Sequence, residues 1–319
     1  MNRGQDITVF LEQSGWQDAA QLPLAGDASS RRYLRLKRGS QSRIMMDAPP
    51  QSCGSSQMFI TIATHLRSAG FNAPEIFDTD VRQGLILMED FGDALIANVL
   101  AADPAREHEL YAAVIDVLAR LNTCPWPDRL TPKSPAKLAE MASLIFAHYA
   151  PDVHAEDQRA ALALLEKHLN ATMDLPPALA LRDFHAENLI WLPGQTPRMR
   201  IGLLDFQDAI VTHPAYDLVS LLKDARRDVS SDVEEAMITR FIDQTGLDEA
   251  RLRHGYAVMG LQRNLRILGV FCRLASARAK PHYLSLLPRV WGHVQDALST
   301  PALIDLKAAF ACLPTPEDR

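Results

Sequence analysis

The sequence has 319 residues, and a hydrophobic share of 47% is enough to bury a large core, which at this length favours two lobes. Its formal net charge of -6 argues against a nucleic-acid partner or an anionic membrane surface. No apolar run approaches the ~20 residues that span a bilayer, and the N-terminus lacks the apolar core of a signal peptide, so we expect a cytoplasmic protein without a membrane partner. The cysteines are scattered without a Cys-x-x-Cys spacing, which indicates reduced thiols.

The N-terminal part of the chain, to about Phe91, predicts a small β-rich lobe. Apolar spacing and stop signals predict helices over residues 6–14 and 57–69. Strands are predicted over residues 22–24, 31–37, 42–47 and 84–89. A turn of small residues, 26–30, joins the first two strands and would let backbone N–H groups approach phosphate oxygens. Taken alone, such a turn is typical of any hairpin.

Beyond Phe91 the sequence becomes strongly helical. Apolar stripes at helical spacing predict helices near residues 110–121 and over residues 138–149, 156–170, 216–223, 232–244, 252–269 and 284–298. Residues 189–192 and 201–204 interrupt this pattern with two short apolar runs. The turn between them contains Pro193, Gly194 and Pro197, so we predict a hairpin of paired strands.

Polar residues with the chemistry of phosphoryl transfer surround this hairpin. Asp183 and Asn188 lie five positions apart, and Asp205 follows the second strand. In phosphoryl transfer one carboxylate accepts the proton of the attacking hydroxyl, while an amide and a second carboxylate hold Mg²⁺ against the nucleotide phosphates. His185 is expected to orient the loop by hydrogen bonding, and a purely structural role for it stays open.

Three motifs here resemble those of aminoglycoside phosphotransferases and choline kinases, a branch of the protein-kinase superfamily. Residues 181–188 (L-R-D-F-H-A-E-N) resemble the loop H-G-D-x-H-x-x-N, residues 204–207 (L-D-F-Q) the metal loop, and residues 212–218 (T-H-P-A-Y-D-L) the element G-D-P-x-x-D-L. The resemblance implies an α+β, protein-kinase-like two-lobed fold, with an N-lobe over residues 1–91 and a helical C-lobe over residues 92–319. It also implies an enzyme, a kinase with ATP and Mg²⁺ as cofactors.

The same resemblance assigns roles to individual residues. Asp183 would be the catalytic base, Asn188 and Asp205 the metal ligands, and Asp217 a brace for the catalytic loop from a helix start. The loop at Ser29 and Ser30 would cover the phosphates, and Met88 and Glu89 would lie beside the adenine. The letters Asp90-Phe91-Gly92 spell the metal triplet of protein kinases, but they precede the catalytic Asp183 instead of following it. We therefore expect them at the hinge between lobes, without a metal.

A closer resemblance covers most of the chain. The segments G-D-A-S-S-R-R-Y (26–33), M-D-A-P-P (46–50) and Q-R-N-L-R-I-L-G-V-F-C-R-L (262–274), with Lys280 and Tyr283, resemble the bacterial anomeric kinases of cell-wall sugars. That family phosphorylates N-acetylmuramate and N-acetylglucosamine at C1 in peptidoglycan recycling. The resemblance implies a small-molecule partner, an amino sugar, with Arg263 near it. The basic side chains of this region fit a neutral or acidic acceptor better than a polycationic aminoglycoside.

One departure from the kinase pattern keeps alternatives open. Kinases carry a lysine on the third strand and a glutamate on the following helix, whereas this chain has Met45 and Met46 on that strand and no acid between Ala48 and Pro74. In the strand over residues 31–37, alternation puts Arg31, Tyr33, Arg35 and Lys37 on a face that we expect to be solvated, and Arg32, Leu34 and Leu36 on the face that packs inward. We therefore expect Arg32 to grip the phosphates in place of the lysine, with a water-exposed Arg32 at the strand mouth as the alternative. The alternatives are another small-molecule kinase, acting on an aminoglycoside, choline or homoserine-like acceptor, and a nucleotide-binding pseudokinase.

Overall fold

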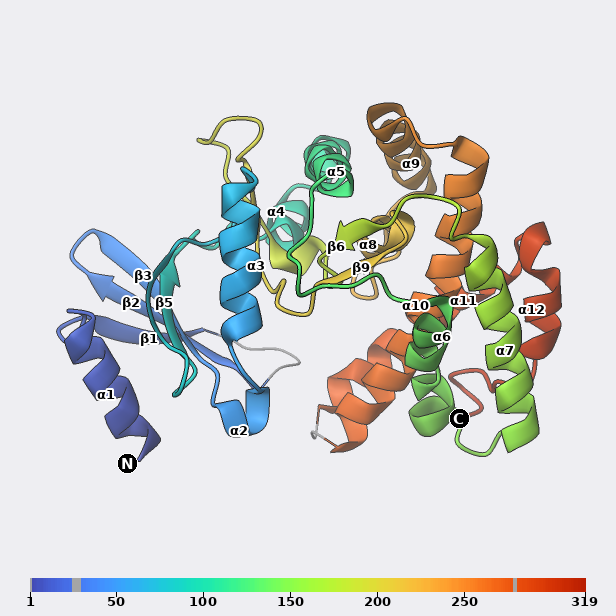
Figure 1. Cartoon of the computed structure of the whole chain (residues 1–319), viewed down its shortest axis with the longest axis horizontal. Coiled ribbons are helices and arrows are strands. Elements are labelled where there is room, and N and C mark those ends of the chain that lie inside the picture. The colour runs from blue at the N-terminus through green and yellow to red at the C-terminus, as the bar shows by residue number, and fades with distance from the viewer. Residues whose placement is uncertain (1, 25–29, 278–279) are drawn as a thin grey trace. The chain divides into compact units, whose positions relative to one another are not determined.

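The computed structural model describes residues 2–24, 30–277 and 280–319, and its chain forms two compact units (Figure 1). The first unit combines Met1–Ala105 with Glu187–Ala209, and the second combines Arg106–Ala186 with Ile210–Arg319. The division therefore differs from the boundary expected after Phe91. Helix α4 (Ile96–Ala102) belongs to the first unit, because the segment leading into it is tied to a later hairpin: the Trp191 N–H donates to the carbonyl of Ala94 at 2.7 Å.

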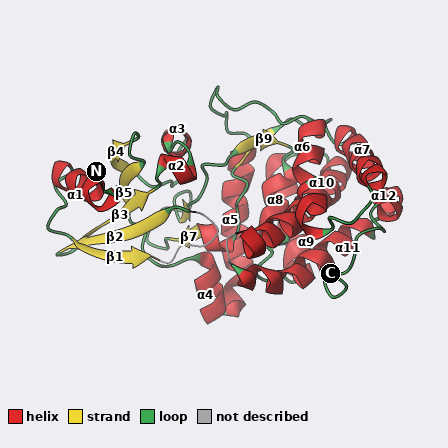
Figure 2. Cartoon of the chain, turned by 90° about the horizontal axis from the view of Figure 1, so that it is seen from below, coloured by secondary structure: helices red, strands yellow, loops and turns green. Residues whose placement is uncertain are grey.

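The first unit is built on a five-stranded antiparallel sheet in the order β1-β2-β3-β5-β4 (Figure 2). Its strands are β1 (Ala20–Leu24), β2 (Arg32–Arg38), β3 (Gln41–Asp47), β4 (Ile76–Asp80) and β5 (Leu85–Glu89). Helix α1 (Arg3–Gln13) begins at a capping box. The Asn2 side chain accepts a backbone N–H of the first turn, and the Gln5 side chain accepts the backbone N–H of Asn2. The short α2 (Pro50–Cys53) and α3 (Gln57–Ser68) connect β3 to β4.

The two faces of this sheet have different neighbours, since Figure 1 shows α1 on one side and α3 on the other. The α1 side is an apolar core that includes Leu11 of α1, Leu36 of β2 and Met45 of β3, each at most 1% exposed. Side chains alternate along a strand, so Tyr33, Arg35 and Met46 lie on the opposite face.

The predicted hairpin after the catalytic loop is confirmed and forms part of the first unit. Strand β7 (Leu189–Trp191) pairs antiparallel with β8 (Ile201–Leu203). The hairpin is joined to the start of the unit through Asn72, whose carbonyl accepts the N–H of Leu203 at 2.8 Å. A segment that arrives late in the chain thus completes a unit that begins at the N-terminus.

The second unit is mainly helical, as predicted. Its helices are α5 (Glu107–Asn122), α6 (Pro135–Ala142), α7 (Ala155–Ala171), α8 (Ala215–Leu222), α9 (Ser231–Thr245), α10 (Glu249–Ala277), α11 (Leu287–Leu298) and α12 (Ile304–Ala309). The pairing of two short strands, β6 (Ala178–Ala180) with β9 (Ile210–Thr212), was not predicted. Among the described residues, no helix has both the length and the apolar character to cross a membrane.

The helix predicted over residues 138–149 is interrupted, and the long helix α10 gives the reason. Helix α6 ends at Ala142, and a π-helical turn, Ile145–Tyr149, follows. Gly269 of α10 lies against the backbone between them: a Cβ atom added to Gly269 would stand 2.2 Å from the carbonyl oxygen of Leu144. Close approach of two backbones fixes the break, and only glycine permits it.

Candidate active site

Asp217 of α8 holds the backbone of residues 181–188, the expected catalytic loop. Its carboxylate accepts the N–H groups of Leu181 and Arg182, the latter at 2.9 Å, and its side chain is buried. Burial raises the pKa of Asp217 to about 7, while the two N–H donors act in the opposite direction. Asp183 follows directly, so the position of the expected base is set by its neighbours' backbone contacts with α8.

Arg182 and Asp205 share an uncommon backbone conformation. Their φ angles are 77° and 55°, and among the described residues they are the non-glycine residues with positive φ. Such conformations cost about 1–3 kcal/mol each and persist where the surrounding structure enforces them, often at functional sites. One precedes the expected base and the other is itself an expected metal ligand, so the local strain falls on the two loops that the sequence singled out.

A second contact holds the catalytic loop from the carbonyl side. Ser220 of α8 donates from Oγ to the carbonyl of Arg182 at 3.1 Å, and Arg263 of α10 donates from Nη2 to the same Oγ at 2.7 Å. Arg263 is only 5% exposed. The expectation that Arg263 lies near the acceptor stays a prediction; in the structure its side chain is buried against Ser220 and braces the loop.

His185 is a buried, neutral group within the same loop. It is 6% exposed, and its Nε2 lies 3.5 Å from Nη1 of Arg226. Burial, followed by the charges of Arg226 and Arg263, holds the pKa of His185 well below its usual value. A neutral imidazole cannot supply a positive charge to a phosphate, so the geometry fits the expected orienting role.

The β7–β8 hairpin brings the two expected metal ligands to neighbouring strand ends. The N–H of Leu204 donates to the carbonyl of Asn188 at 3.0 Å, which puts Asn188 beside the residue before Asp205. The Asp205 carboxylate also accepts the side-chain amide of Gln207 at 2.8 Å. One carboxylate and one amide oxygen form a small, hard donor set of the kind that Mg²⁺ takes together with waters and nucleotide phosphates. The residues present therefore fit a magnesium ion.

Tyr33 shows which face of the N-terminal sheet is turned towards this metal loop. Burial, and then the nearby Asp205 carboxylate, raise the pKa of Tyr33. The sequence predicted that the strand face with Arg31, Tyr33 and Arg35 is solvated. That prediction is wrong, because Tyr33 is close to Asp205 and Arg35 is paired with acids.

Arg32 lies on the other face and has a partner within the chain. Its guanidinium donates from Nε to Asp47 at 3.0 Å, and Arg3 of α1 pairs with the same carboxylate. The Arg32 side chain is 65% exposed and that of Asp47 only 2%. The acid that pairs with Arg32 is Asp47 on the neighbouring strand, not a residue of the following helix, so the premise that Arg32 needs a phosphate partner is incorrect.

The triplet Asp90-Phe91-Gly92 has structural contacts in the first unit. Asp90 accepts hydrogen bonds from Ser42 and from Arg35, and Arg35 also pairs with Asp93 at 2.7 Å. The Phe91 ring occupies the space that a Cβ on Gly202 would need, at 2.8 Å. These contacts tie the end of β5 to the β2–β3 hairpin and to β8.

The remaining expected nucleotide contacts lie in or near the first unit's sheet. Met88 is 5% exposed on β5, and Glu89 accepts the N–H of Glu75 at 3.1 Å. Ser30 is exposed at the end of the β1–β2 turn. Ser29 lies outside the described residues.

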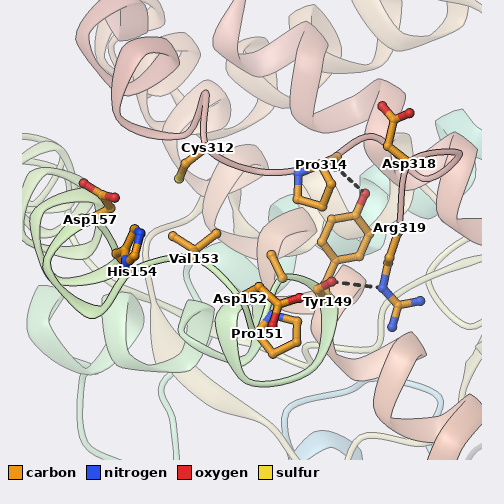
Figure 3. Close-up of a pocket in the computed structure, with 11 residues that line it drawn as sticks. Tyr149, Pro151, Asp152, Val153, His154, Asp157, Cys312, Pro314, Asp318 and Arg319 are labelled. Carbon is orange, nitrogen blue, oxygen red and sulfur yellow. Dashed lines mark hydrogen bonds between the residues drawn. The ribbon is translucent and has the colours of Figure 1, made fainter.

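A pocket in the second unit contains none of the expected site residues (Figure 3). It is lined by the segment around Tyr149 and by the C-terminal residues. Tyr149 donates from its hydroxyl to the carbonyl of Pro314 at 2.9 Å, and Arg319 donates to the carbonyl of Tyr149 at 2.9 Å. These contacts hold the C-terminal segment in place.

Comparison with known proteins identifies the family. Residues 21–254 match the phosphotransferase enzyme family. The chain belongs to this family. The resemblance seen in the three sequence motifs is thereby confirmed, and the protein is a phosphotransferase enzyme.

Two relatives within the phosphotransferase family are similar over almost their whole length. The N-acetylmuramate/N-acetylglucosamine kinase of Caulobacter vibrioides is 36% identical, and the match covers 95% of this chain and 94% of the relative. The enzyme of the same name from Pseudomonas aeruginosa is 28% identical over 94% of this chain and 91% of its own.

Solved structures of phosphotransferases share the fold. A choline/ethanolamine kinase family protein from Mesorhizobium loti superposes with a TM-score of 0.66 at 14% identity, covering 96% of this chain and 98% of its own. LicA in complex with AMP gives 0.65 at 16% identity, covering 92% and 98%. The predicted kinase-like fold is confirmed.

Proposed function

We propose that this chain is an ATP- and Mg²⁺-dependent kinase that phosphorylates an amino sugar, with the anomeric hydroxyl of N-acetylmuramate or N-acetylglucosamine as the acceptor. The observation that carries the proposal is the 36% identity to the Caulobacter vibrioides kinase over nearly the whole chain. At that level and coverage the acceptor class of the relative is the first candidate for this chain.

The roles proposed for the chain's own residues follow the chemistry of phosphoryl transfer. Asp183 accepts the proton of the sugar hydroxyl, the oxygen attacks the γ-phosphorus, and the bond to the β-phosphate oxygen breaks, so that ADP leaves. His185 stays neutral and orients the loop. Asn188 and Asp205 would hold Mg²⁺, which when bound neutralises charge on the phosphates.

The nucleotide is proposed to bind the first unit. Ser29 and Ser30 would cover its phosphates through their backbone N–H groups, and Met88 and Glu89 would lie beside the adenine. Arg32 is not included, because its guanidinium is paired with Asp47 on the α1 face of the sheet.

The charges around the catalytic loop support a neutral or acidic acceptor. After burial, the charges of Arg226 and Arg263 lower the pKa of His185. Burial and the charges of Arg182 and Arg263 lower the pKa of Arg266, and the Asp183 carboxylate raises it. A polycationic aminoglycoside would meet repulsion from these guanidinium groups, since like charges at close range cost energy.

The test is turnover of ATP across a panel of acceptors: N-acetylmuramate, N-acetylglucosamine, hexoses, an aminoglycoside and choline. We expect ADP formation with the two N-acetyl sugars, and a product that has lost its reducing end because C1 carries the phosphate. Turnover with choline or an aminoglycoside alone would replace the sugar kinase with another small-molecule kinase.

One observation keeps a pseudokinase as second candidate. The buried strand position that faces α3 and the metal loop carries Met46, not a lysine. Nucleotide binding without turnover of any acceptor on the panel would favour that candidate.

A further inference from the structure

The N-terminal end of α3 lies against the loop that carries the expected metal ligand Asp205. The ring of Phe59, in the first turn of α3, stacks on the ring of Phe206 with 5.0 Å between the centroids and 21° between the planes. A helical side chain covers the turn that precedes its own Cα, so Phe206 packs over the start of the helix. Both segments belong to the first unit. The start of α3 is therefore close to Asp205, the chain neighbour of Phe206.

Tyr33 of β2 gives a second indication of this proximity. After burial, the Asp205 carboxylate and then the Cys53 thiol raise the pKa of Tyr33. Cys53 ends α2 and lies three positions before Ser56, the N-cap residue of α3. Figure 1 shows α2 at the end where α3 begins. One tyrosine is thus near both Asp205 and the segment that leads into α3.

The first turn of α3 has backbone donors without an acceptor. The N–H of Gln57, the first helical residue, donates to Oγ of Ser55 at 3.2 Å. The N–H groups of Met58 and Phe59 have no acceptor among the residues that the structure describes. Such N–H groups give the start of a helix a partial positive charge that attracts anions. The first turn contains no acidic residue that would neutralise this charge.

Ser56 gives an independent indication of a ligand at this helix end. A serine at the N-cap ordinarily accepts an N–H of the first turn, but the Ser56 side chain makes no capping hydrogen bond. Its Oγ has no partner within the described part of the chain, although the residue is only 5% exposed. A buried hydroxyl without a partner loses its hydration and gains nothing, so native proteins almost always supply one. An anion at the helix end accepts from this hydroxyl and from the backbone N–H groups together.

The missing lysine and glutamate indicate which anion this is. In kinases a lysine on the third strand holds the nucleotide phosphates, and a glutamate on the following helix pairs with that lysine. Here the third strand carries the buried Met46, and α3 contains no acid. A glutamate at the start of α3 would repel a phosphate from the helix end, so its absence agrees with a phosphate bound there.

We propose that the start of α3, through the N–H groups of Met58 and Phe59 and the hydroxyl of Ser56, binds a phosphate of the nucleotide in place of the missing lysine. This inference rests on the proposed function. Asp205 alone would repel a phosphate, and the Mg²⁺ that it is proposed to hold removes that repulsion. A free phosphate ion has the same chemistry as a nucleotide phosphate, so the test includes both.

Charge placed on the first helical residue tests the assignment. Gln57 is exposed, and Gln57→Glu and Gln57→Lys put opposite charges beside the proposed phosphate. Thr64 is also exposed and lies two turns further along the same side of α3, about 10 Å away, so Thr64→Glu and Thr64→Lys are matched controls. Binding of adenosine, AMP, ADP, ATP and inorganic phosphate is measured by calorimetry with and without Mg²⁺. Urea unfolding gives the stability of each variant.

We expect Gln57→Glu to weaken ADP and ATP binding by roughly three- to thirtyfold and Gln57→Lys to strengthen it by roughly three- to tenfold. Adenosine binding should change by less than about twofold in both. Stability should change in the opposite direction, because an acid at a helix start stabilises the helix and a base destabilises it, and a purely structural role cannot give these opposite signs. Ser56→Ala should weaken ADP binding roughly tenfold, the loss of one hydrogen bond to a charged group, and the Thr64 variants should stay within about twofold of the wild type.

Other outcomes overturn the assignment. Equal effects of the Gln57 and Thr64 variants would show only the general charge of the surface, and equal effects on adenosine and ADP would show that the phosphates are not involved. An effect on inorganic phosphate alone would assign the helix end to a free phosphate ion. If Ser56→Ala does not fold, the exposed Gln57 decides. If the wild type binds ADP but phosphorylates no sugar, the proposed function fails and these affinities still decide the inference; if it binds no adenine nucleotide, both fail.

Discussion

Arg263 on α10 donates a 2.7 Å hydrogen bond to the hydroxyl of Ser220 on α8. The same hydroxyl donates to the carbonyl of Arg182, the residue before the proposed base. A helix that does not carry the base thus helps to position it. We expect Ser220→Ala to lower kcat by roughly ten- to a hundredfold with little change in KM, because small misplacement of a catalytic group has effects of this size. Steady-state kinetics measures the split. Ser276→Ala, whose hydroxyl donates to a carbonyl within α10, is the control, and an unchanged kcat in Ser220→Ala would contradict the bracing role.

Substitution of the proposed base and of a proposed metal ligand should affect different steps, turnover in the first case and Mg²⁺-dependent nucleotide binding in the second. Asp183→Asn removes the proton acceptor, so we expect turnover to fall by ~10² to 10⁴-fold while Mg·ATP binding is retained. Asp205→Asn should instead weaken the Mg²⁺-dependent part of nucleotide binding, measured by calorimetry with and without Mg²⁺. Asp90→Asn is the comparison for a carboxylate held by Arg35 and Ser42, and it should lower thermal stability without altering the Mg²⁺ dependence. Equal loss of metal dependence in Asp90→Asn and Asp205→Asn would contradict these assignments.

Neighbouring arginines on the β2 side should behave oppositely. The charge of Arg31 lowers the pKa of Tyr33, the residue close to Asp205. Arg32 instead pairs with Asp47 beside α1. We therefore expect Arg31→Ala to lower kcat with ATP by roughly 10² to 10³-fold, the size seen when one group that stabilises transition-state charge is lost. Arg32→Ala should stay within a few-fold of the wild type. The reverse order in a turnover assay would restore the phosphate role to Arg32.

Two glycines of α10 should respond oppositely to alanine. At Gly269 the new Cβ would meet the backbone of Leu144, which cannot move without displacing the π-helical turn, so we expect a loss of stability of about 2–4 kcal/mol. At Gly260 the nearest atom is a methyl of Val219 at 3.9 Å, an ordinary contact. Gly260→Ala should raise stability by up to about 1 kcal/mol, the usual helix preference of alanine. Urea unfolding measures both, and a tolerated Gly269→Ala would refute the close approach.

His213, at the start of α8, predicts a pH dependence of stability. Its Nδ1 accepts the N–H of Ala215, and burial lowers its pKa to about 4. Between pH 4 and its unfolded value near 6.5 the folded protein binds fewer protons than the unfolded one, so this contribution to stability rises with pH and is lost as pH falls. The contribution amounts to about 3 kcal/mol at most. In urea unfolding, the stability of the wild type relative to His213→Asn should increase from pH 4 to pH 6.5, and a constant difference would show that His213 does not titrate in this way.

The loops of the candidate site could be predicted from the sequence because their chemistry is local. Asp183 and Asn188 lie in one short motif, and the β7–β8 hairpin has turn residues between two apolar runs. The faces of β2 could not be assigned, since alternation separates two sets of side chains but does not say which set meets α1. Leu36 was correctly expected in a core, yet that core lies against α1, and Tyr33 on the opposite face is the one close to the metal loop.

Contacts between distant segments account for the other differences. The close approach of Gly269 to the backbone of Leu144 breaks the predicted helix over residues 138–149. The sequence around Leu144 does not indicate that contact. Phe91 depends in the same way on Gly202, far along the chain. The strands β6 and β9 have three residues each, which is too short for alternation to be visible.

The first unit is assembled from two stretches of chain separated by Arg106–Ala186 of the second unit. During synthesis on the ribosome, the sheet and α3 emerge early, but the β7–β8 hairpin that pairs with Asn72 is not yet translated. At ~5–20 residues per second, that interval is on the order of ten seconds. During that interval the carbonyl of Asn72 and the Phe91 ring lack their final neighbours in the hairpin, so we expect the nascent N-terminal stretch to expose surface that chaperones can bind.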